Sequence, residues 1–491
     1  MSINLSLPLP EIRERRLSTI LSYDGSATDL LEKSNQKEIK CLGRLYGQCS
    51  DCQEGCATSM ASYVRGGAVV SHAPIGCFSG DAIRDNAGKA VSKARGLGDF
   101  NNATICTNIQ EKDTVYGGTE KLRKAIFEIN RRQHPTVIFV TTSCASGIIG
   151  DDVESICAEC ADELDIPVVP VMCEGFKSKV WSTGFDAAFH GILKYIVKPP
   201  KKKQPDLVNI FNFEGSDTFT PLLAKLNLRS NYMVPLATLD QLESLSEAAC
   251  SAQICETLAT YIAHGLEQEY GVEEVKAPAP YGINWTDAWL REIARITNRT
   301  DLVEDVIASE HERIAPTLEE YRSKLAGKRV YIVAGDAYTH NLANALKDLG
   351  MTIAGISALH HDQKSDSDEV NTLKYLVEST GEIQNFTVCN KQPYQLVKLI
   401  RRANPDFMII RHQGLTELGY KLGIPTIFEG DANYTVGYDG VLHLGRRLWE
   451  SHLTRKFIEN VAEHTTLPYT DWWLEEEEDP FYYEQARRKS K

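Results

Sequence analysis

The sequence predicts a protein of the α/β class, in which helices cover several parallel β-sheets. Apolar runs of strand length alternate with helical patterns, as in residues 137–140, 150–163 and 166–171. Strand, turn, helix and strand at this spacing form a βαβ unit with a parallel sheet. The same alternation returns after residue 329, and 491 residues is too long for one hydrophobic core. We therefore expect three Rossmann-like domains with parallel sheets.

A stretch rich in proline and lysine, residues 198–205, sets the clearest domain boundary. The second domain begins with a strand at 207–211 and continues in a long helical region from 241 to 270. The third contains strands at 329–335, 352–357, 407–410 and 424–428, with a helix at 340–348. The expected parts are an N-terminal arm that frays or wraps a neighbour (1–40), three α/β domains (41–205, 206–327 and 328–450), and a C-terminal helix with a solvated acidic tail (451–491).

Composition restricts the class of partner. The chain is 42% apolar and 24% charged, with a net charge of −14. Binding to nucleic acid needs a basic face, so nucleic acid is not expected as the main partner. No apolar run approaches the roughly 18 residues that span a bilayer. Prolines and charges interrupt residues 1–16, which lack the layout of a signal peptide. We expect a cytoplasmic location.

The chain has 13 cysteines, which in a cytoplasmic protein favour metal ligation or buried thiols over disulfides. Several of them lie within apolar periodic patterns, and we expect these to be core residues: Cys157, Cys160, Cys250 and Cys389.

Three other cysteines stand just beyond rigid elements, at Cys52, Cys77 and Cys144. Thiolates placed at loop tips in this way are how proteins hold soft metal clusters. A four-iron cluster normally takes four thiolates, so three in one chain indicate that a second chain supplies the others. Either Cys49 or Cys56 can take the place of Cys52 in this assignment.

The chain carries no nucleotide motif of its own. Gly335 follows a strand and opens a helix, but the glycine spacing of a dinucleotide site is missing, and no P-loop pattern occurs anywhere. If the system uses ATP, another protein binds it.

Four segments resemble the motifs of one family: residues 71–77, 110–118, 144–155 and 171–176. In this order they are similar to α-type chains of the nitrogenase component-1 family, over about residues 41–450. The resemblance implies that Cys52, Cys77 and Cys144 share an interface cluster of the [8Fe-7S] type with a homologous β-type chain in an α2β2 assembly. The 25-residue spacing from Cys52 to Cys77 agrees with the family. An ATP-hydrolysing iron–sulfur reductase protein is implied as the electron donor.

The family's α-type chains also have a lone cysteine that anchors a large iron–sulfur cofactor of the [8Fe-9S-C] type. It stands 16 residues before the glycine that ends its helix, as Cys255 stands before Gly271 here. Alternatively, Cys255 belongs to an apolar stripe with Leu258, Ile262 and Leu266. The shared spacing favours the ligand.

The chain departs from the family at the cofactor pocket. The histidine that holds the far end of the cofactor corresponds to Gly430. Three further pocket positions correspond to Trp181, Phe185 and Asp85, and an arginine of the glycine turn falls near Ala337. These losses imply a cofactor without molybdenum. Its far end would meet solvent or one of the nearby side chains Glu429, Asp431 and His361.

We favour the hypothesis that the chain belongs to a nitrogenase-like reductase acting on a substrate other than dinitrogen. Among its branches, methylthio-alkane reductase, which cleaves C–S bonds in small thioethers, fits best. Trp181 and Phe185 would form an apolar wall suited to a thioether. The alternatives are an iron–sulfur cofactor-assembly scaffold and the α chain of an alternative nitrogenase. The family's tetrapyrrole reductases are disfavoured because they would not need Cys255.

Overall fold

A computed structural model describes residues 2–39, 52–78, 81–100, 103–211, 217–233, 236–367, 370–389, 393–411, 415–430, 435–470 and 474. The chain divides into two compact units. The first comprises Met1–Arg16, Asp51–Val275 and Ile293–Arg299, and the second comprises Leu17–Ser50, Lys276–Glu292 and Thr300–Lys491. Apart from Leu474, the predicted acidic tail lies outside the described residues. None of the described helices is long and apolar enough to cross a membrane.

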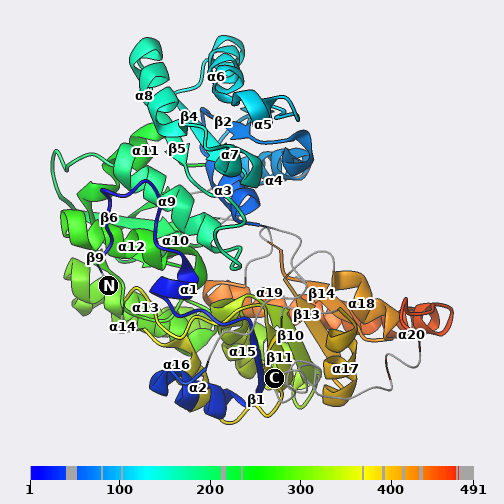
Figure 1. Ribbon diagram of the computed structural model, residues 1–491. Coiled ribbons are helices and arrows are strands. Elements are labelled where there is room, and N and C mark those ends of the chain that lie inside the picture. The colour runs from blue at the N-terminus through cyan, green and yellow to red at the C-terminus, as the bar shows by residue number, and fades with distance from the viewer. Residues whose placement is uncertain are drawn as a thin grey trace. The chain divides into compact units, whose positions relative to one another are not determined.

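The first unit contains two parallel sheets (Figure 1). One has the order β3-β2-β4-β5, with β2 (Gly67–His72), β3 (Ala103–Cys106), β4 (Val137–Thr142) and β5 (Val168–Val171). The helix α6 (Thr119–Gln133) and its neighbour α8 (Val153–Leu164) cover one face, while α3 (Gln53–Ser62) and α9 (Thr183–Tyr195) cover the other. Every residue of β4 is buried, which explains its uninterrupted run of β-branched and apolar residues.

The other helices along this part of the chain are η1 (Ile75–Phe78), α4 (Asp81–Ala94), α5 (Asp113–Tyr116) and α7 (Cys144–Ile149), and the short α1 (Arg13–Arg16) belongs to the same unit. The second sheet has the order β7-β6-β8-β9, with β6 (Gln204–Phe211), β7 (Arg229–Met233), β8 (Ala248–Gln253) and β9 (Glu273–Glu274). Its helices are α10 (Phe219–Ala224), α11 (Leu239–Glu243), η2 (Ser244–Glu247) and α12 (Glu256–Tyr270).

Helices α13 (Ile283–Thr297) and α14 (Thr300–Leu325) lead along the chain to the sheet of the second unit. Its order is β1-β12-β11-β10-β13-β14. The strands are β1 (Ser22–Gly25), β10 (Arg329–Ala334), β11 (Thr352–Ala358), β12 (Phe386–Cys389), β13 (Phe407–Ile410) and β14 (Thr426–Phe428). All pairings are parallel except that of the edge strand β1 with β12.

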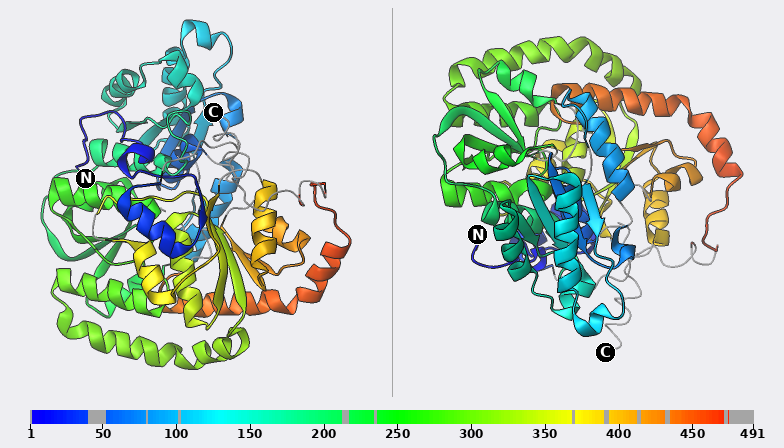
Figure 2. Two further views of the ribbon diagram at one scale, coloured as in Figure 1. Left: turned by 60° about the horizontal axis from the view of Figure 1, so that its bottom comes forward. Right: turned by 90° about the horizontal axis from the view of Figure 1, so that it is seen from above.

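The helices of this unit are α2 (Ala27–Gln36), α15 (Asp336–Asp348), α16 (Thr372–Thr380), α17 (Pro393–Ala403), α18 (Thr416–Lys421), α19 (Gly437–Leu453) and α20 (Arg455–Glu463). Helix α14 (light green) packs against α19 (orange), and the pair can be followed in both views of Figure 2.

The predicted α/β class with parallel sheets is confirmed. Two local expectations were wrong. The helical region predicted from 241 to 270 contains the buried strand β8, and only α12 extends through its second half. The N-terminal arm does not fray over residues 2–39. Residues 22–25 form β1 in the second unit, and residues 3–16 belong to the first unit, where Ile3 is bound to α12 and Leu7 to α9. Cys157, Cys160 and Cys250 are buried as expected, whereas the side chain of Cys389 lies outside the described part.

Candidate iron–sulfur site

Parallel pairing of β2 with β4 sets the position of two of the predicted ligands. His72 ends β2 directly opposite Thr142, the last residue of β4. Because both strands end at the same edge, the segments that follow them meet there. Cys77 lies in η1 after β2, and Cys144 is the first residue of α7 after β4. Both cysteines are exposed.

Cys52 reaches the same place from a third element, since it is the N-cap residue of α3 and is also exposed. Gly175 lies between two of the cysteines. A β-carbon at Gly175 would be 3.4 Å from the Cys144 Sγ and 3.4 Å from the Cys52 Cβ. The structure therefore brings Cys52, Cys77 and Cys144 together. Of the two alternatives to Cys52, Cys56 is buried in the core, and Cys49 lies outside the described residues.

A buried carboxylate lies beside these thiols. Glu54, in the first turn of α3, is 4% exposed and accepts a hydrogen bond of 2.6 Å from the Ser71 hydroxyl. Although Cys77 is exposed as a residue, neighbouring atoms partly shield its sulfur from water, and this desolvation, followed by the charge of Glu54 and its hydrogen bond with the thiol, raises the pKa of Cys77 to about 12. Nearby Cys52 and Cys144 contribute further. A nearby metal cation would favour the thiolate form of Cys77 at neutral pH.

Two neighbouring cysteines have other partners. The Cys173 thiol donates to the Thr142 carbonyl at 3.3 Å, and burial raises its pKa. The Cys106 thiol donates to the Ala73 carbonyl at 3.1 Å. Among the residues that the structure describes, the exposed thiols at this edge are those of Cys52, Cys77 and Cys144.

Hydrogen bonds join the sequence segments on which the resemblance rests. The ring of His72 bonds through Nδ1 to the Thr107 hydroxyl at 3.1 Å and through Nε2 to Asp151 at 2.9 Å. Asp151 also accepts from the Gly118 amide at 2.9 Å, and a β-carbon at Gly118 would be 2.8 Å from its Oδ2. The Ser143 hydroxyl donates to the His72 carbonyl at 2.9 Å. These residues fix the turns that carry the cysteines.

Large apolar side chains are exposed around the cysteines, and they come from the same short segments: Ile75, Val115, Tyr116, Ile148 and Phe176. Tyr116 is 88% exposed, and its helix α5 packs against α7, which begins at Cys144. Clustered exposed apolar residues mark interaction surfaces more often than single ones do. Exposed thiols within an apolar surround fit a metal cluster that a second chain covers.

Cys255 lies at a different sheet. It ends the turn after β8 and is the N-cap residue of α12, with an extended backbone (φ −160°). Gly271 ends the same helix with a left-handed backbone (φ 64°), so the 16-residue spacing is the length of one helix with its caps. Cys255 is 8% exposed, unlike the three cysteines at the first sheet.

The start of α9, which packs against α12, carries the two aromatic pocket candidates. The rings of Trp181 and Phe185 meet edge to face, with centroids 5.6 Å apart. Asp85 has a different environment. On α4, it pairs with Lys89 at 2.5 Å, an ordinary surface ion pair.

Two of the side chains considered for the far end of the cofactor, Glu429 and His361, lie in the described part of the chain. Both already bind other side chains of this protein. Glu429 is buried, accepts from Thr435 at 2.5 Å and pairs with Arg447. His361 uses both ring nitrogens, toward Asp336 at 2.9 Å and Ser34 at 3.0 Å. Asp431 lies outside the described residues.

Gly430 is closely packed. A β-carbon there would lie 2.5 Å from the ring of Phe428. Ala337, near the position of the family's glycine-turn arginine, is buried in α15.

Sequence reasoning missed Glu54 and Gly175. Neither stands in a recognisable ligand pattern, and only the tertiary fold places them beside cysteines that are distant in sequence. Two signals were available, since Glu54 follows Cys52 by two residues and Gly175 lies in the family-like segment 171–176.

The fold and the converging thiols fit a protein that holds an iron–sulfur cluster, and comparison with known proteins identifies the family. The family described as nitrogenase component 1 type oxidoreductase matches residues 52–452. The chain belongs to this family.

Some of the similar proteins are named as nitrogenase alpha chains and others as cofactor biosynthesis proteins. The chain is 32% identical over 304 residues to the nitrogenase molybdenum-iron protein alpha chain of Methanosarcina barkeri, covering 59% of this chain and 56% of that relative. It thus spans little more than half the length of that protein. It is 28% identical over 389 residues to the nitrogenase iron-molybdenum cofactor biosynthesis protein NifE of Methanococcus maripaludis, covering 76% and 77%. The solved structure of nitrogenase Cp1 at pH 6.5 shares the fold, with a TM-score of 0.70, 22% identity, and coverage of 88% and 93%.

Proposed function

We propose that this chain is the α-type catalytic subunit of a nitrogenase-like reductase. The observation that carries the proposal is the convergence of three exposed cysteines, from three separate elements, within an apolar surround. Cys52, Cys77 and Cys144 would hold an interface cluster of the [8Fe-7S] type. Thiolates are the ligands that such clusters take, and the small Gly175 leaves room between two of them.

The partner at this surface would be a homologous β-type chain in an α2β2 assembly. Three thiolates do not complete a large cluster, so the remaining ligands come from outside the chain. Covering Tyr116 and the apolar residues around it would remove them from water, which favours association.

Cys255 would anchor the large iron–sulfur cofactor, of the [8Fe-9S-C] type and without molybdenum. Its place at the start of α12 holds the sulfur on a rigid element. Gly430 offers no ligand for a far-end metal, and Glu429 and His361 are engaged elsewhere. When bound, the cofactor would supply low-potential electrons to the substrate.

The substrate would be a small methylthio-alkane. Trp181 and Phe185, whose rings meet edge to face, would form an apolar wall, which suits a thioether better than a polar intermediate. Reduction of 2-(methylthio)ethanol by two electrons and two protons gives ethylene, methanethiol and water. The electrons would come from a separate ATP-hydrolysing iron–sulfur protein.

A cofactor-assembly scaffold is the second candidate, favoured by the similarity to NifE over three quarters of the chain. An anaerobic assay separates the two functions. It combines the complex with its β-type partner, the reductase protein, ATP and 2-(methylthio)ethanol. Release of methanethiol with a hydrocarbon supports the reductase. Transfer of an intact cluster to an apo-acceptor, without turnover of any thioether, supports the scaffold and rejects the reductase.

A further inference from the structure

The N-terminal segment, residues 3–16, is fastened along α9 and α12 of its own unit. The backbone of Ile3 exchanges two hydrogen bonds of 2.8 Å with the Gln268 side chain on α12. The Leu7 carbonyl accepts from His190 at 2.9 Å and Lys194 at 3.0 Å, both on α9. These ties hold the segment in place before it reaches α1.

At α1 the segment enters the interior. Arg13 is 1% exposed, and its guanidinium donates to both carboxylate oxygens of Asp186, at 2.8 and 2.6 Å. Arg16 pairs with the same carboxylate at 2.5 Å and lies over the Tyr261 ring at 4.8 Å. Burying such charges is favourable only when they are paired in good geometry. The buried pairing therefore depends on these two arginines and on Asp186.

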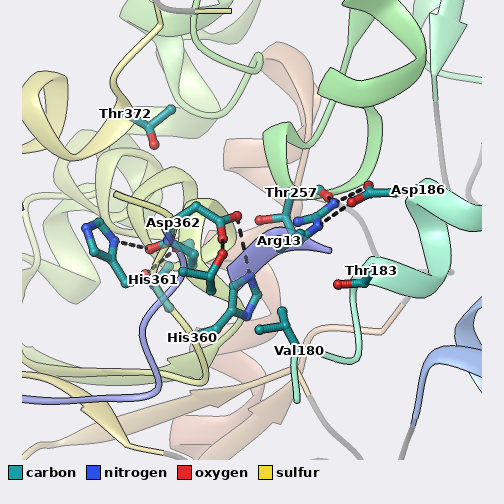
Figure 3. Close-up of polar contacts among 12 residues, drawn as sticks. Arg13, Val180, Thr183, Asp186, Thr257, His360, His361, Asp362 and Thr372 are labelled. Carbon is teal, nitrogen blue, oxygen red and sulfur yellow. Dashed lines mark hydrogen bonds and ion pairs between the residues drawn. The ribbon is translucent and has the colours of Figure 1, made fainter. Parts of the chain in front are cut away.

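Arg13 also makes a contact that ion pairing does not require. Its Nη2 donates to the Thr257 carbonyl at 2.6 Å. Figure 3 shows Arg13 beside both Asp186 and Thr257. Thr257 lies in the first turn of α12, two residues after Cys255. Asp186 lies in the first turn of α9, next to Phe185. One guanidinium thus joins the helix start that carries Cys255 to the helix start that carries the aromatic wall.

We infer that Arg13 is a positioning residue for the cofactor bound to Cys255. By holding Thr257 and Asp186 together, it sets where the Cys255 sulfur stands relative to Trp181 and Phe185. This inference rests on the proposed function, since it concerns the cofactor of that same site.

Arginine suits this role because of its shape. The planar guanidinium presents a rigid fork of donors, so one side chain can bind a carboxylate and a carbonyl in fixed directions. Lysine carries the same charge on a flexible stem and binds as a point charge. Supporting residues must hold a site within roughly 0.5 Å of its working geometry, so this difference is expected to alter the cofactor.

The test compares Arg13→Lys with Arg15→Lys in the full complex with the β-type partner, purified anaerobically. Arg15 lies on the same short helix and is exposed, which makes it the matched control. Iron content and the electron paramagnetic resonance spectrum report the cofactor, the interface cluster serves as internal reference, and thermal unfolding reports the fold. We expect R13K to remain folded, keep the interface cluster, lose cofactor iron several-fold and show an altered cofactor spectrum. R15K should match the wild type.

An unchanged cofactor spectrum and iron content in R13K would overturn the inference, and so would parallel loss of both clusters. Arg13→Ala provides a second test. If the guanidinium positions the site, added methylguanidinium should restore the cofactor spectrum of this variant. Absence of rescue in folded R13A counts against the inference. Failure of the proposed function looks different, since the wild-type complex would then release no methanethiol from 2-(methylthio)ethanol, whereas failure of this inference leaves R13K with the cofactor iron and spectrum of the wild type.

Discussion

Cys52 and Cys144 lie on either side of Gly175, although 92 residues separate them in the chain, and a β-carbon at Gly175 would touch both at 3.4 Å. Such a distance is ordinary van der Waals contact, so alanine fits between the thiols themselves. A cluster bound to those thiols would fill the same space. The glycine therefore matters to the occupied site more than to the fold.

Replacing Gly175 by alanine should leave thermal stability close to that of the wild type while lowering the iron bound at the interface cluster. Gly175→Val should lower it further. Iron analysis of the anaerobically purified complex measures the effect. Gly76→Ala is the control beside Cys77, since a β-carbon there meets no atom of the described chain within 4 Å. Full cluster occupancy in Gly175→Val would contradict the prediction.

Cys255→Ala should abolish the cofactor and the activity but leave the interface cluster intact, because the two sites lie at different sheets. Cys250→Ala is the matched control. Cys250 is a buried cysteine in the strand just before Cys255, and its loss should cost about 1 kcal/mol of stability without removing metal. Metal analysis and electron paramagnetic resonance spectra distinguish the variants. Retention of the cofactor in Cys255→Ala would reject Cys255 as its anchor.

Glu54→Gln should lower the pKa of the Cys77 thiol from its value of about 12, because it removes a nearby negative charge and leaves only a weaker, uncharged hydrogen-bond acceptor. Burial remains, so the pKa should stay above that of a free thiol. In the metal-depleted protein, the rate of Cys77 alkylation should therefore rise at a lower pH than in the wild type. Glu111→Gln, at an exposed position, is the control. Identical alkylation profiles for Glu54→Gln and the wild type would show that Glu54 does not influence the thiol.

Asp348 provides a test of stability against pH. Burial raises its pKa from 3.8 to about 6, although it accepts a hydrogen bond of 2.6 Å from the Ile283 amide. The folded state therefore binds this proton more tightly than the unfolded state does. Its contribution to stability is complete below about pH 4 and is lost as pH rises through about 6, a change of up to about 3 kcal/mol.

Asp348→Asn removes this titration and retains an oxygen acceptor for Ile283. Between pH 4 and 7, the free energy of unfolding of the variant should increase relative to that of the wild type. Denaturant unfolding at several pH values measures the difference. Asp305→Asn, on an exposed face of α14, should show no such change. Parallel curves for Asp348→Asn and the wild type would contradict the assignment.

The sequence predicted those parts of the fold and site that depend on local pattern. The strand at 137–142 could be predicted because its buried residues form one unbroken apolar and β-branched run. Cys77 and Cys144 could be grouped because each was expected just beyond a rigid element and in a motif of the family, and the structure adds that the two strands before them pair in one parallel sheet. Strand β8 could not be predicted, since its small residues (AACSAQ) extend the helical pattern of the residues around them. The partners of Arg13 were also beyond reach, because Asp186 and Thr257 meet it only through tertiary packing.

The packing of Gly430 against Phe428 constrains the order in which mutations can accumulate. A histidine introduced at 430 would bring its β-carbon to 2.5 Å from the Phe428 ring, so the single change is expected to damage the fold. Replacing Phe428 with a smaller residue first would open the necessary space. Placing a histidine at 430 would therefore take two changes, and the first of them adds no ligand by itself.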